Sequence, residues 1–347
     1  MRTRLVTRAM LVALATVTAP ALGQKDQVRL TKGGTVTGQI VATTADLITL
    51  RTPAGETRRV PTIEARAVLF ADEPSALTQA RINAANGGYA TALRRLKEID
   101  ARELDRDRVR DEARFLAALC EVRLAAVGQG DAAAAYKRLG SFLKARPDSH
   151  HTYAAVEALG DLLVAIGRHD RAASMYARLA KAPFPSLSLR AEVFTGRALQ
   201  AKGDHGAALE RFEQALKLEA EGEGVEAERL SAKLGSAWSL AETGDLDAGV
   251  ELAREVVLAA GDGEPAKLAR GYNTLGRCYE AAGKPIDALL AYLHTDLLFD
   301  NDPDAHAEAL SRLAVLWNAA GKPEDARDAA SRLRGQYASS RWAAEAG

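Results

Sequence analysis

Residues 269–296 read ARGYNTLGRCYEAAGKPIDALLAYLHTD. The spacing of their apolar residues predicts two short amphipathic helices joined by a tight turn. One face of the first helix is lined by Tyr272, Leu275, Gly276 and Tyr279. Gly283 and Pro285 mark the turn, because glycine tolerates the conformation that ends a helix and proline presets the backbone of the next one. On the answering face of the second helix, Ala288 is small enough to let the two helices approach closely.

This arrangement resembles the tetratricopeptide repeat, which has a bulky residue, Leu-Gly, an aromatic residue, a turn glycine, an alanine and a second aromatic residue at set spacing. The residues in these places are Tyr272, Leu275, Gly276, Tyr279, Gly283, Ala288 and Tyr292. The resemblance implies a mainly α fold, a right-handed superhelical solenoid of helix pairs, and a role in binding other proteins.

The same turn signal recurs seven times: a glycine is followed five residues later by a small residue. The pairs are Gly87 with Ala92, Gly130 with Ala135, Gly167 with Ala172, Gly203 with Ala208, Gly244 with Gly249, Gly283 with Ala288 and Gly321 with Ala326. Successive turn glycines are 36 to 43 residues apart, against about 34 in the family. We expect longer first helices or connections to absorb the difference. Other all-helical repeats of about 40 residues fit this spacing but not the glycine-to-alanine rule.

The units differ in how well they follow the pattern. In the fifth unit, Gly235 precedes the turn glycine by nine residues, whereas the strong units have seven. Either the first helix of that unit is longer, or Ala237 takes the small position. The neighbouring Trp238 fits the family's buried aromatic position, which predicts a core residue; an aromatic residue of the groove is the alternative. Arg123 in the second unit stands where a small residue is expected.

Residues 26–71, which precede the helices, have a different composition and pattern. Five short runs rich in Val, Ile, Leu and Thr are separated by turn formers: VRL, TVTGQIVAT, LITLRT, TRRVP and AVLF. They predict a small antiparallel barrel or rolled sheet, similar to SH3-like or Sm-like barrels. Gly38 is a candidate for a bulge or bend. Residues 72–78 read as a linker in which Ser75 caps the following helix, and residues 79–347 as the repeat array.

Residues 1–23 have the features of a secretory signal peptide. Three arginines precede an apolar segment, which ends in small residues suited to cleavage after Gly23. An uncleaved anchor helix is the alternative, but the segment is short and interrupted by Thr16, Thr18 and Pro20. The signal predicts a periplasmic or secreted protein.

Composition narrows the function further. The 347 residues contain 46 basic and 46 acidic side chains, so no broad positive surface exists to bind nucleic acid. After the N-terminus, no apolar run approaches the roughly 20 residues that span a bilayer. Cys120 and Cys278 are predicted in first helices of distant repeats, buried and too far apart for a disulfide. A bridge between two chains is the alternative.

Motifs for chemistry are missing from the sequence. It contains no GxSxG, P-loop or GxGxxG motif, and no histidine pair has the spacing of a helical metal site. His150 and His151 follow Pro147-Asp148 and are expected in a solvated loop. The sequence therefore predicts no catalytic residues, no cofactor and no metal, and a protein that is not an enzyme.

The inner groove of the solenoid is the remaining candidate site. Its expected partner-binding residues are Arg190, Arg197, Gln200, Arg270, Asn273, Arg277 and Arg312. Guanidinium groups can hold carboxylates with two hydrogen bonds, which favours a protein or peptide ligand with acidic groups. The match to the family's carboxylate clamp is poor, because its Lys and Asn residues do not recur. The alternative is a solvated charged face, with Asp161, Glu280 and Glu308 as internal partners.

These features predict a scaffold or adaptor of the bacterial cell envelope that binds another protein along its concave surface. Two alternatives stay open. One is a structural array that associates with copies of itself. The other is an accessory subunit of an envelope complex, in which the β module contacts peptidoglycan or the outer membrane while the helices recruit an enzyme.

Overall fold

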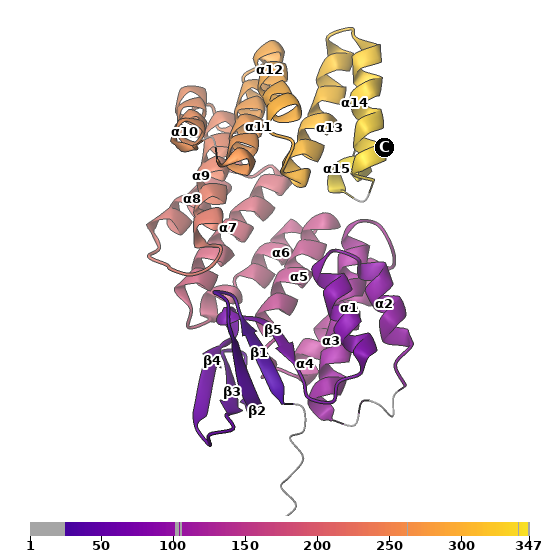
Figure 1. The fold of residues 1–347 in the computed structure, drawn as a ribbon. Helices are drawn as coiled ribbons and strands as arrows, with labels where there is room; N and C mark the ends of the chain where they lie inside the picture. The colour runs from indigo at the N-terminus through magenta and orange to yellow at the C-terminus, as the bar shows by residue number, and fades with distance from the viewer. Residues whose placement is uncertain (1–24, 101–103, 105, 262, 339, 346–347) are drawn as a thin grey trace, which may run out of the picture.

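The computed structural model describes residues 25–100, 104, 106–261, 263–338 and 340–345. The predicted signal peptide, residues 1–23, lies outside this part of the chain. Within it, a five-stranded antiparallel sheet is followed by seven pairs of helices and a short final helix (Figure 1). The fold is thus mainly α with a small β module in front, as the sequence predicts.

The strands of the module follow the predicted runs. They are β1 (Asp26–Leu30), β2 (Thr35–Thr43), β3 (Leu47–Arg51), β4 (Thr57–Pro61) and β5 (Ala65–Leu69). The order across the sheet is β4-β3-β2-β1-β5, and the short 3-10 helix η1 (Thr62–Glu64) connects β4 to β5. A Cβ at Gly38 would meet the Arg51 carbonyl oxygen at 2.4 Å, so a larger residue does not fit there. The register shift itself falls two residues later, between Ile40 and Ala42.

The helices alternate between first and second members of each pair. The first three pairs are α1 (Ser75–Ala85) with α2 (Tyr89–Lys97), α3 (Asp107–Ala126) with α4 (Ala132–Ala145), and α5 (Thr152–Ala165) with α6 (His169–Tyr176). The next four are α7 (Pro185–Lys202) with α8 (His205–Lys217), α9 (Val225–Glu242) with α10 (Leu246–Ala259), α11 (Pro265–Ala281) with α12 (Pro285–Leu298), and α13 (Pro303–Ala319) with α14 (Pro323–Gln336). The 3-10 helix η3 (Leu179–Lys181) follows α6, and α15 (Arg341–Glu345) is the final helix.

The predicted turn signals have the expected geometry. All seven turn glycines have positive φ, from +67° at Gly283 to +124° at Gly130. All seven small residues that follow them are buried. First helices of 17 to 20 residues, from α3 onward except α5, account for repeats longer than 34 residues.

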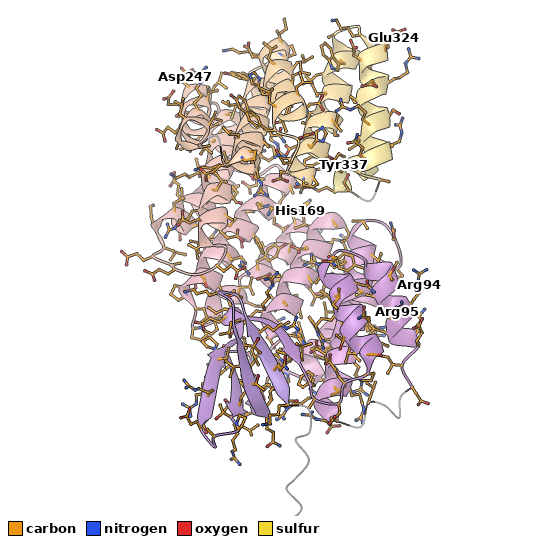
Figure 2. All side chains as sticks on the ribbon, viewed as in Figure 1. Arg94, Arg95, His169, Asp247, Glu324 and Tyr337 are labelled. Carbon is orange, nitrogen blue, oxygen red and sulfur yellow. The ribbon has the colours of Figure 1, made fainter. Side chains whose placement is uncertain are left out.

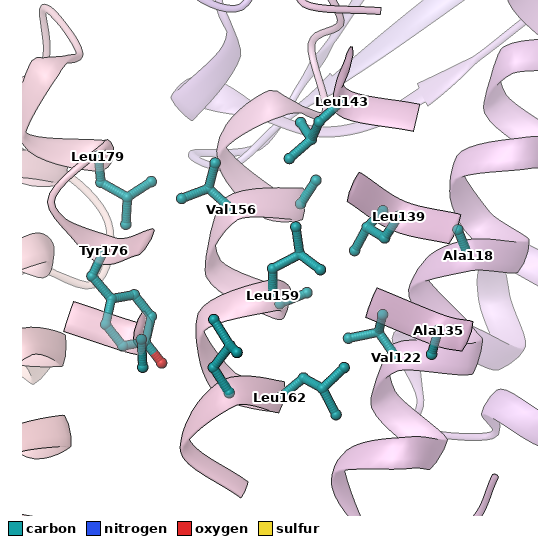
Figure 3. Packing of buried hydrophobic residues seen from close by; sticks show 14 of the residues in the cluster. Ala118, Val122, Ala135, Leu139, Leu143, Val156, Leu159, Leu162, Tyr176 and Leu179 are labelled. Atoms are coloured by element: carbon teal, nitrogen blue, oxygen red, sulfur yellow. The ribbon is translucent and has the colours of Figure 1, made fainter. Parts of the chain in front are cut away.

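Within the third, fourth and sixth pairs, a glycine on the first helix faces an aromatic ring on the second. A Cβ at Gly160 would meet the Tyr176 ring at 2.2 Å, and one at Gly276 would meet the Tyr292 ring at 2.6 Å. Figure 3 shows one of these cores, with Tyr176 and Leu179 on one side of the α5 residues Val156, Leu159 and Leu162 and the side chains of α3 and α4 on the other.

The fifth pair resolves the offset seen in the sequence. Ala237 is fully buried and takes the small position. A Cβ at Gly249 would meet the Ala237 carbonyl oxygen at 2.5 Å. Gly235 instead faces the ring of Phe212 from the preceding pair. In this pair, a small residue on each helix therefore replaces the glycine and aromatic ring of the third, fourth and sixth pairs.

The β module and the first helices share one core. Strand residues such as Val28 and Ile48 lie in the same buried cluster as Leu77 of α1 and Leu116 of α3. The connection is also shorter than the predicted linker 72–78, because α1 already begins at Ser75. Pro74 is the N-cap residue and Ser75 makes no capping hydrogen bond, so the predicted cap at Ser75 is wrong.

Asp26 stabilises the contact between the β module and the first helices. Its buried carboxylate accepts hydrogen bonds from the backbone N–H groups of Ile40 and Ala71, both at 2.8 Å, and from the Arg106 guanidinium at 3.0 and 3.1 Å. Burial by itself would raise the pKa of Asp26, but these hydrogen bonds outweigh it and hold the pKa below its usual value.

Neighbouring pairs stack mainly through the second helix of one pair and the first helix of the next, and successive first helices also touch. Helix α7 contacts α9, and α9 contacts α11 directly, whereas each second helix packs between the first helices on either side of it. First helices therefore line the inner side of the array. In Figure 2, the labelled charged side chains of α2, α10 and α14 (Arg94, Arg95, Asp247 and Glu324) lie at the periphery.

Cys120 and Cys278 are buried and free, as predicted. Burial raises the pKa of both thiols to about 12. No helix in the described ranges is both long and apolar enough to span a membrane.

Candidate functional site

The inner side of the array carries a row of equivalent positions. Each follows the small residue that lies seven positions before a turn glycine. We call this set the inner row: Asp161, Arg197, Trp238, Arg277 and Val315. Its members range from an exposed arginine to an exposed valine, so the row is chemically varied along the array.

At the C-terminal end, the predicted groove residues bind the next first helix. Arg270 Nε donates to Asp302 at 2.7 Å, and the Asn273 side chain donates to the Ala305 carbonyl oxygen at 2.8 Å. Arg277 pairs with Glu308, and Arg312 reaches back to Glu280. All these contacts join α11 to α13.

The same pattern holds in the middle of the array. Arg190 of α7 pairs with Glu157 of α5 at 3.0 Å and with Glu228 of α9 at 3.4 Å. Gln200 is buried and donates to the Gly235 carbonyl oxygen and to Ser239, both at 2.9 Å. These contacts and the pairs between α11 and α13 form what we call the inter-repeat ladder.

Six of the seven predicted groove residues are therefore held within the array rather than gathered into an open clamp. The internal partners named by the alternative interpretation are found as such: Asp161 binds Arg123 at 2.6 Å, and Glu280 and Glu308 bind arginines on neighbouring first helices. Arg197 differs from the other six. It is exposed, and it has no ion pair within the described part of the chain.

Trp238 lies on this inner side instead of in a core. It is half-buried, its indole N–H donates to Glu242 at 2.9 Å, and the Arg277 guanidinium lies 4.4 Å from its ring centre. On its other side, Arg277 approaches Trp342 of α15 at 5.6 Å. The core position predicted for Trp238 is wrong because Ala237, one residue earlier, faces the core.

A hollow lies where the β module meets the first repeats. It has a volume of about 670 Å³ and is lined by η1, β5, α1, α3 and the residues that open α5. Tyr153 of α5 also donates to Asp46, between β2 and β3, which ties the sheet to the third helix pair. Sequence reasoning missed this hollow, because it forms between segments far apart in the chain.

Glu112, His150 and His151 converge on the wall of this hollow. Glu112 is 4% exposed, and its Oε2 lies 2.7 Å from His151 Nε2 and 3.7 Å from His150 Nε2. Burial lowers the pKa of His150 to about 3, with the neighbouring His151 adding to the effect. Burial opposes ionisation of Glu112, but His151 and Arg81 outweigh it and lower its pKa.

The solvated loop predicted for both histidines is therefore wrong. His150 and His151 are partly buried, and the His151 ring stacks on Phe115 at 3.7 Å. No local sequence pattern indicates this contact, because Glu112 lies 39 residues before His151 and on another repeat.

No protein-family model and none of the curated proteins matches the chain. Several solved structures do. A tetratricopeptide repeat protein from Parabacteroides merdae is 14% identical, covering 78% of this chain and 97% of its own, with a TM-score of 0.54. The apo form of RapI (13% identical, 78% and 79%) and NprR in complex with its cognate peptide NprX (14%, 78% and 80%) have TM-scores of 0.49 and 0.47. Together with the seven helix pairs, the first likeness shows that this chain has the tetratricopeptide repeat fold.

Proposed function

We propose that this protein is a non-enzymatic scaffold or adaptor that binds a protein or peptide along the inner row. The supporting observation is Arg197, an exposed guanidinium without an ion pair among the described residues, whose equivalent position in the next repeat is the aromatic Trp238. The inter-repeat ladder keeps this surface in one arrangement before the partner arrives, which lowers the entropic cost of binding.

The chemistry of the inner row selects the partner. Arg197 offers a planar fork of donors that suits a carboxylate. Trp238 and Val315 offer partly exposed apolar surface further along, the latter with 54% of its surface exposed. An extended segment with an acidic residue followed by apolar residues fits this order.

Exchange of Arg197 tests the proposal. We expect Arg197→Asp to weaken partner binding about tenfold or more, because a hydrogen bond to a charged group is worth about 1.5–3 kcal/mol. The matched control is Arg171→Asp on α6, an exposed arginine that also has no ion pair among the described residues. The measurement is affinity capture from an extract of the source cells with the chain lacking residues 1–23.

The supporting result is a protein captured by the wild-type chain and by Arg171→Asp but not by Arg197→Asp. Equal capture by all three chains, or no specific capture by the wild type, would contradict binding at the inner row. Thermal melts of both variants show whether each has kept its fold.

We also propose that the protein is exported to the periplasm or secreted, on the basis of the basic and apolar pattern of residues 1–23. A binding scaffold with an inner row of this kind would then act on proteins of the cell envelope.

A further inference from the structure

We propose that Glu112, His150 and His151 bind a divalent transition metal ion, with zinc the best match to their two imidazoles and one carboxylate. We call this group the junction triad. Glu112 lies in the middle of α3, and the two histidines end the connection that leads into α5. The site would stand at the seam between the β module and the array, away from the inner row, so it does not rest on the proposed binding function.

The three ligand atoms have the right separation for one ion. They lie within 4.8 Å of one another, with Glu112 Oε2 at 2.7 Å from one imidazole nitrogen and 3.7 Å from the other. Tetrahedral zinc with bonds of about 2.0–2.1 Å places its ligand atoms about 3.3–3.4 Å apart. To coordinate the ion, the Glu112–His151 separation would lengthen by about 0.6–0.7 Å and the Glu112–His150 separation would shorten by about 0.3–0.4 Å.

One of these atoms has no other partner. His150 Nε2 is buried and makes no hydrogen bond. A buried polar atom left in this state lowers stability, so such atoms are rare without a functional reason. A metal ion between the two histidines and Glu112 would satisfy it.

The surrounding residues orient the ligands. Arg81 Nε donates to Glu112 Oε1 at 3.1 Å, which leaves Oε2 directed at the imidazoles. Arg81 is itself held by Glu73 through two hydrogen bonds of 2.8 and 3.0 Å. Hydrogen bonds of this kind to a ligating carboxylate are characteristic of metal sites.

The charges are also compatible with a cation. Arg81 is neutralised by Glu73, so Glu112 supplies one net negative charge when both imidazoles are neutral. Phe115 stacks on His151 and fixes the plane of its ring. Two imidazoles and one carboxylate form a ligand set that zinc uses in proteins.

The remaining coordination position faces the hollow. All three residues line its wall, together with Tyr153 and Arg190. Three protein ligands and an open fourth position allow a bound water or an external ligand to complete the tetrahedron. The ion would thus be reachable from the hollow.

Metal titration of the full chain, with any affinity tag removed and metal stripped by a chelator, tests the junction triad. We expect isothermal titration with Zn²⁺ to show one tight site per chain. Co²⁺ should give the visible absorption of a tetrahedral complex, and Zn²⁺ should abolish it. The absence of stoichiometric binding by the wild-type chain would overturn the proposal.

His150→Ala is the decisive variant, because His150 Nε2 makes no hydrogen bond whose loss would unfold the chain. Its zinc affinity should fall at least about tenfold, since even the loss of a residue that only orients a ligand costs 10–100-fold. His294→Ala, at an exposed histidine on α12, is the control and should bind as the wild type does. Equal affinities for His150→Ala and the wild type would also overturn the proposal.

Discussion

At the scale of single residues, three of the helix pairs depend on a glycine that faces an aromatic ring. Phe212 is fully buried, and its ring faces Gly196 of its own pair and Gly235 of the next. A Cβ at these glycines would meet the ring at 2.7 and 2.5 Å, respectively. Tyr176 and Tyr292 extend the same packing with hydroxyl groups that donate to Asp161 and Glu280. One ring can therefore join two consecutive pairs.

Gly196→Ala should lower the free energy of unfolding by about 1–3 kcal/mol, because the added methyl group overpacks the contact with Phe212. Gly140→Ala is the control, since Gly140 lies inside α4 with nothing within 4 Å of a Cβ. That change should raise stability by about 0.5–1 kcal/mol. Urea unfolding measures both, and equal effects of the two changes would contradict this account of the packing.

At the scale of elements, Asp26 joins β1 to the start of α3 and to the segment between β5 and α1. A carboxylate with a lowered pKa stabilises the folded chain above its unfolded pKa of about 3.9. That contribution is lost as the pH falls through the lower folded value.

Asp26→Asn should therefore lower the free energy of unfolding at pH 7 by about 1.5–3 kcal/mol, the value of one hydrogen bond to a charged group. The difference from the wild type should shrink as the pH falls below about 4. Asp170→Asn is the control, because Asp170 pairs with Lys202 on the surface and should matter little. Urea unfolding from pH 7 to pH 3 checks both; a difference that does not change with pH would contradict the role of the charge.

Sequence reasoning succeeded where the signal is local. The turn glycines and their small partners lie five residues apart, and each strand of the β module is a continuous run between turn formers, so one short window contains the whole pattern. The seven helix pairs and five strands were predictable for this reason.

It left two interpretations open where partners lie one repeat away. Arg270 binds Asp302 and Arg277 binds Glu308, at separations of 32 and 31 residues, so no short window of the sequence shows which carboxylate each arginine binds. The junction triad is hidden in the same way, between α3 and the connection to α5. Trp238 was misplaced for a different reason: a shift of one position turns a core residue into an inner-face residue.

At the scale of the whole molecule, the export that we propose would decide where the chain meets a partner. When the full gene is expressed in a bacterial host, the chain recovered from the periplasm should begin at Gln24. Intact-mass measurement checks this, with a chain in which Arg2, Arg4 and Arg8 are changed to Glu as the control, because a signal peptide needs its positive region. Recovery of the uncut chain from the membrane fraction would instead support the anchor helix.

The inter-repeat ladder also has a mechanical consequence. Ion pairs and hydrogen bonds tie the first helices to one another along the inner edge, while the second helices are spaced apart along the outer edge. The inner edge of the array is therefore stiffer than the outer edge. The array should resist being straightened more than it resists being coiled further. Because the carboxylates of these pairs are largely buried, salt screens them less than it screens exposed pairs, so the array should keep most of its stiffness when the ionic strength rises.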